Sequence, residues 1–188
     1  YEIYPVGITQ EGQWYYCPAC DADRVENGEW ERMADKVPAL LPPDRSVHGL
    51  VLLRDGRTET IRLDCVFPVL HGAGGEDGTV QGLLELAGIP YVGCGVAACA
   101  NSMDKSITKA LIEPTGVRQA KYYLALRYDF ERNAEGVVRT AADQLGSFPV
   151  FVKPCSQGSS VGVAKANDML ELAAGLTEAF KLDDKVLV

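Results

Sequence analysis

The stretch that most constrains the fold is residues 148–162, Phe-Pro-Val-Phe-Val-Lys-Pro-Cys-Ser-Gln-Gly-Ser-Ser-Val-Gly. Its apolar, β-branched start predicts a strand that ends at Lys153, and Gly158, Ser159 and Ser160 predict a loop before a further strand. A lysine beside such a loop can bind phosphate, because glycine lets backbone N–H groups approach an anion closely. The pattern is not that of a P-loop, and an ordinary surface hairpin with an exposed lysine would show the same local signal.

The composition favours a soluble, cytoplasmic protein. The chain has 188 residues, 47% of them hydrophobic, which is enough for a core and for two modest domains. A formal net charge of −8, with 18 basic residues scattered along the chain, argues against nucleic acid or a membrane surface as partner. No signal peptide is visible, and no apolar run approaches the ~20 residues that span a bilayer.

The six cysteines are predicted to be reduced, structural thiols. Cys17 and Cys20 have the spacing of half a zinc site or of a redox pair. A zinc site needs a second pair, and Cys94 and Cys99 are far along the chain with a different spacing. We therefore assign no metal ligand to this chain.

The ends of the chain suggest a segment of a longer protein. Tyr1 opens an extended pattern without a methionine, and Val188 closes another. We expect the function read from these residues to be incomplete.

Residues 1–92 are predicted to form an α/β domain with a parallel sheet. Asp55-Gly56 between two β-rich runs predicts a two-residue hairpin. The apolar run at 65–70 predicts a strand buried on both faces of a parallel sheet, followed by a glycine-rich turn and a helix over 79–87. Residues 17–46 are predicted to be largely irregular. Further strands are expected at 3–9, 13–16, 47–54, 57–63 and 88–93.

Residues 93–188 are predicted to form an antiparallel-leaning α+β layer. Helices are expected at 95–102, 104–114, 135–145 and 167–180, the second capped by Asp104 and the last by Asn167. Strands are expected at 121–126, 149–153, 161–165 and 185–188.

Two groups of side chains are candidates for a site. His71 follows the strand at 65–70, where open α/β sheets bind ligands, so it is a candidate to bind a carboxylate or move a proton; a structural turn residue is an equal alternative. Glu76 and Asp77 begin the next helix, where carboxylates stabilise the helix dipole. Lys105 begins another helix, and with Lys153 it could neutralise a polyphosphate from both sides.

Four motifs in order carry a resemblance to a known family. They are His-Gly-x-x-Gly-Glu-Asp-Gly-x-x-Gln-Gly, Gly-Ile-Pro-Tyr-Val-Gly, Ser-Met-Asp-Lys and Phe-Val-Lys-Pro-x-x-x-Gly-Ser-Ser-x-Gly-Val, at residues 71–82, 88–93, 102–105 and 151–163. Together they resemble the D-alanine–D-alanine ligase family of the ATP-grasp superfamily. The resemblance covers residues 65–188, whereas residues 1–64 fit only by the opening strand.

The resemblance implies an ATP-dependent ligase that joins two D-alanines through an acyl phosphate, for peptidoglycan precursor synthesis. It implies a partial Rossmann-like N-terminal domain over 1–92 and a central ATP-grasp subdomain over 93–188. A homodimer in the cytoplasm is expected. The cofactors implied are ATP and Mg²⁺, with the metal ligands beyond Val188.

By the same resemblance, each candidate residue has a role. Lys105, Lys153 and Gly158 would bind ATP, and Ser159 and Ser160 would do so from a loop that closes over the nucleotide. Ser159 and His71 would act in catalysis. His71 and Glu76 would bind the first D-alanine.

The family's first strand, with a glutamate that binds the substrate ammonium, and its C-terminal ATP-grasp domain have no counterpart between Tyr1 and Val188. The chain is therefore expected to be inactive alone. Three alternatives stay open: a D-alanine–D-serine or D-alanine–D-lactate ligase, a non-catalytic nucleotide-binding module, and an α/β protein with chance motifs.

Overall fold

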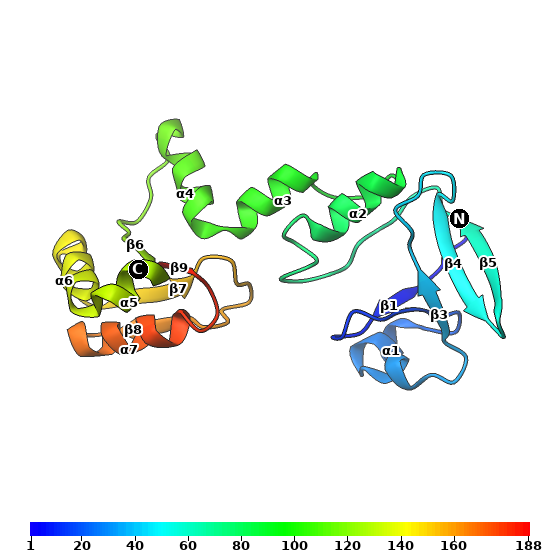
Figure 1. Ribbon diagram of the computed structural model, residues 1–188, viewed down its shortest axis with the longest axis horizontal. Coiled ribbons are helices and arrows are strands. Elements are labelled where there is room, and N and C mark those ends of the chain that lie inside the picture. The colour runs from blue at the N-terminus through cyan, green and yellow to red at the C-terminus, as the bar shows by residue number, and fades with distance from the viewer. The chain divides into compact units, whose positions relative to one another are not determined.

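The computed structural model describes residues 1–188 as two compact units (Figure 1). The first comprises Tyr1–Phe67 and Gly82–Val92, and the second comprises Pro68–Gln81 and Gly93–Val188. Both combine helices with strands, as the predicted α/β class requires. None of the helices combines the length and the apolar composition that crossing a bilayer requires.

The first unit is built on one antiparallel sheet whose five strands follow each other in chain order. These strands are β1 (Val6–Ile8), β2 (Trp14–Tyr16), β3 (Val37–Leu40), β4 (Gly49–Arg54) and β5 (Arg57–Arg62). Asp55 and Gly56, with φ of 48° and 74°, form the left-handed two-residue turn between β4 and β5. The hairpin predicted at this dipeptide is therefore confirmed.

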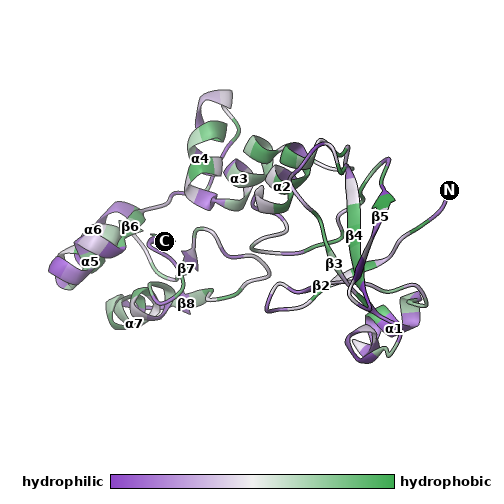
Figure 2. Ribbon diagram, turned by 45° about the vertical axis from the view of Figure 1, so that its right-hand side comes forward, coloured by the Kyte–Doolittle hydropathy of each residue, from purple (hydrophilic) through white to green (hydrophobic).

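Two small hydrophobic clusters stabilise this unit. Leu50 and Leu52 point to the same side of β4, which Figure 2 colours largely green, and are completely buried with Ala39 against Trp14. The second cluster is centred on the helix α2 (Thr79–Ala87) and consists of Leu84, Ala87 and Ile89.

The predicted parallel sheet is reduced to a single contact. Residues 65–70 and 88–93 were expected to form parallel strands, but only Val66 and Tyr91 make a parallel bridge. Pro68 and Pro90 lack the N–H that would extend the ladder. The five named strands instead pair antiparallel, each with its neighbour in the chain.

The second unit contains a four-stranded antiparallel sheet in the order β6-β9-β7-β8. Its strands are β6 (Leu124–Leu126), β7 (Val150–Pro154), β8 (Ala164–Ala166) and β9 (Lys185–Leu187). Its helices are α3 (Val96–Met103), α4 (Lys105–Ile112), η2 (Glu113–Thr115), α5 (Arg127–Arg132), α6 (Ala134–Leu145) and α7 (Met169–Ala179). The sequence did not predict α5, nor the short helices α1 (Ala22–Glu26) and η1 (Glu29–Arg32) within residues 17–46.

Polar caps set the ends of these helices. Asn133 accepts a hydrogen bond from the backbone of Gly136 at the start of α6, and Gly146, with a φ of 79°, ends that helix. Asp168 caps α7 by accepting a hydrogen bond from the Glu171 N–H. The prediction that Asn167 caps this helix is wrong by one residue. The Asn167 side chain donates to the Glu171 carboxylate instead.

The core of the second unit lies between its sheet and the helices α6 and α7. Val150 and Val152 point from β7 into this core, which includes Leu172 and Leu176 from α7. Because side chains alternate along a strand, Phe151 and Lys153 point to the opposite face. Phe151 is exposed and Lys153 is half-buried, so this face is available to a ligand.

Candidate functional site

The glycine-rich turn at residues 71–78 is held by its own carboxylates. Glu76 accepts a hydrogen bond from the backbone of Gly72 (2.6 Å), and Asp77 accepts from Gly74 (2.7 Å) and Thr79 (2.9 Å). Burial opposes the ionisation of Asp77, but these hydrogen bonds more than offset it and lower its pKa. Both carboxylates thus shape the turn.

His71 and Gln81 have different places at this turn. His71 is exposed at its first position. Gln81 is buried and donates from Nε2 to the carbonyl of Gly75 (2.9 Å), which fixes the middle of the turn. The sequence signal for this role, which the predicted site residues do not include, is the place of Gln81 in the motif at 71–82.

Lys105 joins the start of α4 to the loop that follows β7. Its backbone N–H donates to the carbonyl of Cys155 (3.0 Å), and its ammonium donates to the carbonyls of Cys155 (3.2 Å) and Gln157 (2.6 Å). Asp104 caps α4 as predicted, accepting from the backbone of Ser106 and Ile107. The ammonium therefore lies at the base of the glycine–serine loop.

The loop itself is compact and contains left-handed residues. Ser159 and Ser160 have φ of 48° and 62°, and both are exposed. Two turns close it, because Val161 donates to the carbonyl of Gly158 and Val163 to that of Ser160. This backbone presents the two hydroxyls to solvent, where they can reach a ligand.

The loop and the glycine-rich turn are neighbours. A β-carbon on Gly158 would lie 3.7 Å from the Cα of Gly72 and 3.9 Å from the Cε of Met103. The structure thus brings together three motifs that are widely separated in sequence, namely the turn after His71, the helix start at Lys105 and the loop at Ser159.

Lys153 belongs to the strand that leads into this loop. It lies on β7, and its ammonium is 5.8 Å from the centre of the Phe151 ring, a cation–π contact. It has no ion-pair partner among residues 1–188, so its charge is not neutralised by this chain. A free ammonium at the end of a strand that leads into the loop is suited to bind an anion.

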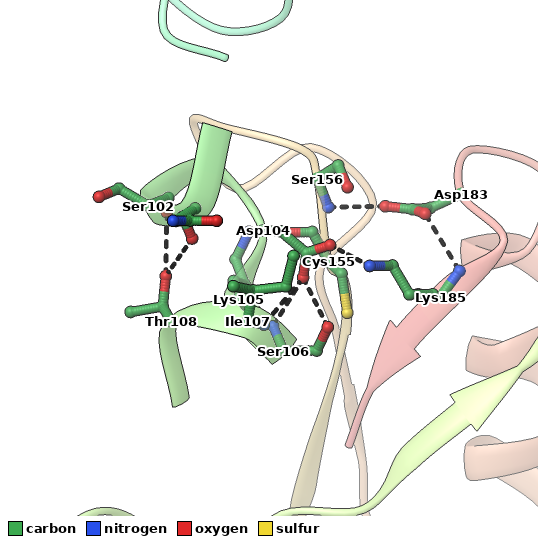
Figure 3. A network of polar contacts seen from close by, with 11 residues as sticks. Ser102, Asp104, Lys105, Ser106, Ile107, Thr108, Cys155, Ser156, Asp183 and Lys185 are labelled. Carbon is green, nitrogen blue, oxygen red and sulfur yellow. Dashed lines mark hydrogen bonds and ion pairs between the residues drawn. The ribbon is translucent and has the colours of Figure 1, made fainter. Parts of the chain in front are cut away.

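A charged network lies beneath the loop (Figure 3). The carboxylate of Asp104 forms an ion pair with Lys185, and Asp183 accepts hydrogen bonds from the backbone of Ser156 (2.6 Å) and Lys185 (3.0 Å). Burial opposes ionisation of Asp104, but the hydrogen bonds from Lys185 and Ser106 lower its pKa. The hydrogen bond to Asp104 raises the pKa of Lys185.

Two surface hollows lie elsewhere, in the first unit. One of about 510 Å³ surrounds the turn at Asp55, and one of about 460 Å³ is lined by residues that include Trp14, Leu40 and Leu53. Neither contains the lysines or the glycine–serine loop. The candidate site is defined by its charged groups and its loop backbone, and these can bind an anion on an open surface as well as in a hollow.

The buried thiol of Cys155 should be protected from labelling. Burial raises its pKa to about 11, and the carboxylates of Asp104 and Asp183 add to the shift. At pH 8 we expect iodoacetamide to modify Cys155 at least ~100-fold more slowly than exposed Cys65, because the thiolate fraction is about 0.1%.

Peptide mass spectrometry over time gives both rates. Because pH 8 and pH 9 both lie below the pKa of Cys155, its rate should rise about tenfold between them. In urea the two thiols should react at similar rates. Equal rates in the folded protein would contradict the burial of Cys155.

Comparison with known proteins shows the family of this chain. Residues 1–94 match the family model described as D-ala D-ala ligase N-terminus, and residues 111–188 match the one described as D-ala D-ala ligase C-terminus. The chain belongs to the D-Ala–D-Ala ligase family. The match to residues 1–94 also shows that the family likeness includes residues 1–64, where the motifs reached only the opening strand.

Relatives in this family are similar along the whole chain. A D-alanine–D-alanine ligase from Caldicellulosiruptor bescii is 42% identical over 188 residues, which is all of this chain and 50% of the relative. The vancomycin B-type resistance protein VanB from Enterococcus faecalis is 40% identical over the same share of each chain. The chain therefore spans about half the length of the curated relatives it matches.

Solved structures of family members have the same fold. The VanG D-Ala:D-Ser ligase from Enterococcus faecalis matches with a TM-score of 0.85 and 36% identity, over 99% of this chain and 52% of that one. The D-alanine–D-alanine ligase from Coxiella burnetii matches with a TM-score of 0.78 and 32% identity, over 97% of this chain and 51% of that one. These neighbours are consistent with a partial ATP-grasp fold.

Proposed function

We propose that this chain provides the D-alanine side and one half of the ATP site of a ligase that joins two D-alanines. The observation that carries the proposal is the meeting of three motifs in one place. Lys105 binds the base of the loop that contains Ser159, and this loop lies close to the turn that begins at His71. The family membership of the chain supports the same activity.

The reaction needs charge neutralisation more than covalent catalysis. The carboxylate oxygen of the first D-alanine attacks the γ-phosphorus of ATP, the bond to the bridging oxygen breaks, and ADP leaves with an acyl phosphate formed. The amine of the second D-alanine then attacks the acyl carbon, phosphate leaves, and the amine loses its proton. Lys105 and Lys153 would hold the phosphates and offset their charge during transfer.

The loop and the turn would position the other reactants. Ser159 and Ser160 would bind phosphoryl oxygens when the loop closes, and closure would exclude water that hydrolyses an acyl phosphate. Gly158 would let the backbone approach the nucleotide. His71 would bind the carboxylate of the first D-alanine, and Glu76 would support that pocket by holding the turn through Gly72.

Residues 1–188 do not fit a Mg²⁺ site of their own. No group of three or more His, Cys, Asp or Glu side chains is placed to hold a metal ion. The carboxylates of Asp104 and Asp183, in the network beneath the loop, already accept hydrogen bonds from the protein. None of the steps above therefore uses a metal bound to these residues.

The proposed ligase works in the cytoplasm, where its nucleotide and amino-acid substrates are, and forms a homodimer, as the resemblance implies. The experiment that tests the function is an assay of the protein at its full encoded length for ADP release that depends on D-alanine. Turnover with D-alanine is the expected result. An absence of turnover with every pair of D-amino acids would overturn the ligase proposal and favour a nucleotide-binding module.

A second candidate is a ligase that adds D-serine. The structural neighbour with a TM-score of 0.85 is a D-Ala:D-Ser ligase. Competition between D-alanine, D-serine and D-lactate as the second substrate separates the candidates. A kcat/KM highest for D-alanine supports the main proposal, and one highest for D-serine or D-lactate replaces it with the corresponding ligase.

A further inference from the structure

We propose that Asp104 and Lys185 are positioning residues that hold the ammonium of Lys105 at the base of the loop and thereby set the affinity for ATP. The inference rests on the proposed function in one respect, the role of Lys105 as a phosphate ligand. It concerns two residues that contact neither substrate in that proposal, and it explains why a partly buried ion pair lies beside the site.

One carboxylate, that of Asp104, connects two elements. Asp104 is only 8% exposed, and its Oδ1 accepts hydrogen bonds from the backbone N–H groups of Ser106 (2.9 Å) and Ile107 (3.2 Å). Its Oδ2 forms the ion pair with the ammonium of Lys185 on β9. The cap of α4 is thus attached through its charge to the central part of the sheet.

The start of β9 also holds the loop. The carbonyl of Lys185 accepts from the Cys155 N–H (3.0 Å), and Asp183 accepts from the backbone of both Ser156 and Lys185. Figure 3 shows the side chains of Asp104 and Lys185 pointing toward one another, with Asp183 beside Ser156. The helix start and the loop base are therefore bound to one short segment of chain.

The position of the Lys105 ammonium depends on this attachment. An ammonium has three donors, and two of those on Lys105 bind the carbonyls of Cys155 and Gln157, leaving one for an anion. This arrangement requires the start of α4 to stay docked beside the loop. A displacement of about 1 Å is enough to weaken such positioning strongly. Loss of the ion pair between Asp104 and Lys185 removes the side-chain link that opposes a displacement of α4.

The test compares steady-state kinetics of single and double variants at full encoded length. Lys185→Met and Asp104→Asn should each raise the KM for ATP about tenfold, with the KM for D-alanine unchanged. Asparagine retains helix capping, so both variants mainly remove the charge pair. The double variant should be no worse than either single variant, because both remove the same interaction. Lys185→Arg should restore most of the affinity.

A matched control is Lys181→Met. Lys181 precedes β9 and forms an exposed ion pair with Glu178, so its removal should leave the KM for ATP unchanged. If the ion pair contributes only to stability, its loss lowers the apparent kcat by reducing the fraction of active enzyme and leaves the KM for ATP unchanged. That result would overturn the proposal. Additive effects of the two single variants would overturn it too.

Calorimetric titration with a non-hydrolysable ATP analogue keeps the test decisive if a variant is partly unfolded. The titration reports affinity and the binding-competent fraction separately. A Kd for the variant that is tenfold higher than that of the wild type, measured in that fraction, supports the proposal. An unchanged Kd overturns it. The same titration applies if the wild-type protein releases no ADP with D-alanine, so failure of the ligase proposal is distinguished from failure of the positioning role.

Discussion

Replacing Lys153 with alanine should weaken ATP binding by about 10- to 100-fold. The ammonium of Lys153 is half-buried and unpaired within this chain, so its charge is available to the nucleotide phosphates. A charge-assisted hydrogen bond in such a place contributes about 1.5–3 kcal/mol. Calorimetric titration of the protein at full encoded length with a non-hydrolysable ATP analogue measures the loss.

Two further variants serve as comparisons for this result. Lys153→Arg keeps the charge but changes its shape, so it should retain part of the affinity. Lys121→Ala removes an exposed lysine outside the strands, and it should leave the Kd unchanged. If Lys153→Ala binds the analogue as tightly as the wild type, Lys153 is not a ligand and the open face of the sheet is not the nucleotide site.

Replacing Leu172 with alanine should lower the free energy of unfolding by about 3 kcal/mol. Leu172 is completely buried between α7 and the sheet, where it packs with Val152 and Leu176. Truncation removes buried methyl groups and leaves a cavity that a close-packed core refills only in part. Urea unfolding followed by far-UV circular dichroism measures the change.

The matched control lies two residues away on the same helix. Leu170 is 81% exposed, so Leu170→Ala should change the unfolding free energy by less than about 0.5 kcal/mol. Similar losses from both variants would mean that α7 does not present Leu172 to the core as described. Such a result would also question the placement of β7 and of Lys153 on it.

Local signals in the sequence were sufficient for many elements. Asp55-Gly56 specifies its turn because both residues tolerate a positive φ, and Asp104 caps α4 through contacts within three residues of itself. The spacing of apolar residues predicted α2 at its observed limits. Asn167 and Asp168 are equally good N-cap residues for α7 by local sequence, and the predicted cap was therefore wrong by one residue.

Long-range pairing could not be read from local patterns. The apolar run at 65–70 has the composition of a buried parallel strand, but only Val66 is paired, because the bridge to Tyr91 is bounded by prolines. The ion pair between Asp104 and Lys185 joins residues 81 positions apart, and no spacing rule indicates it. Gln81 was visible in a motif, but its contact with Gly75 needed the folded turn.

By itself, the sequence determined the family, the four ordered motifs, and the lysines and glycine–serine loop suited to a phosphate. These depend on residue identity and near neighbours, which the chain specifies directly. Only the tertiary structure decided that Gly158 lies against Gly72 and that Lys105 binds the carbonyl of Gln157. Such contacts form only when the sheet brings distant segments together, since the packing of its core sets where each loop begins.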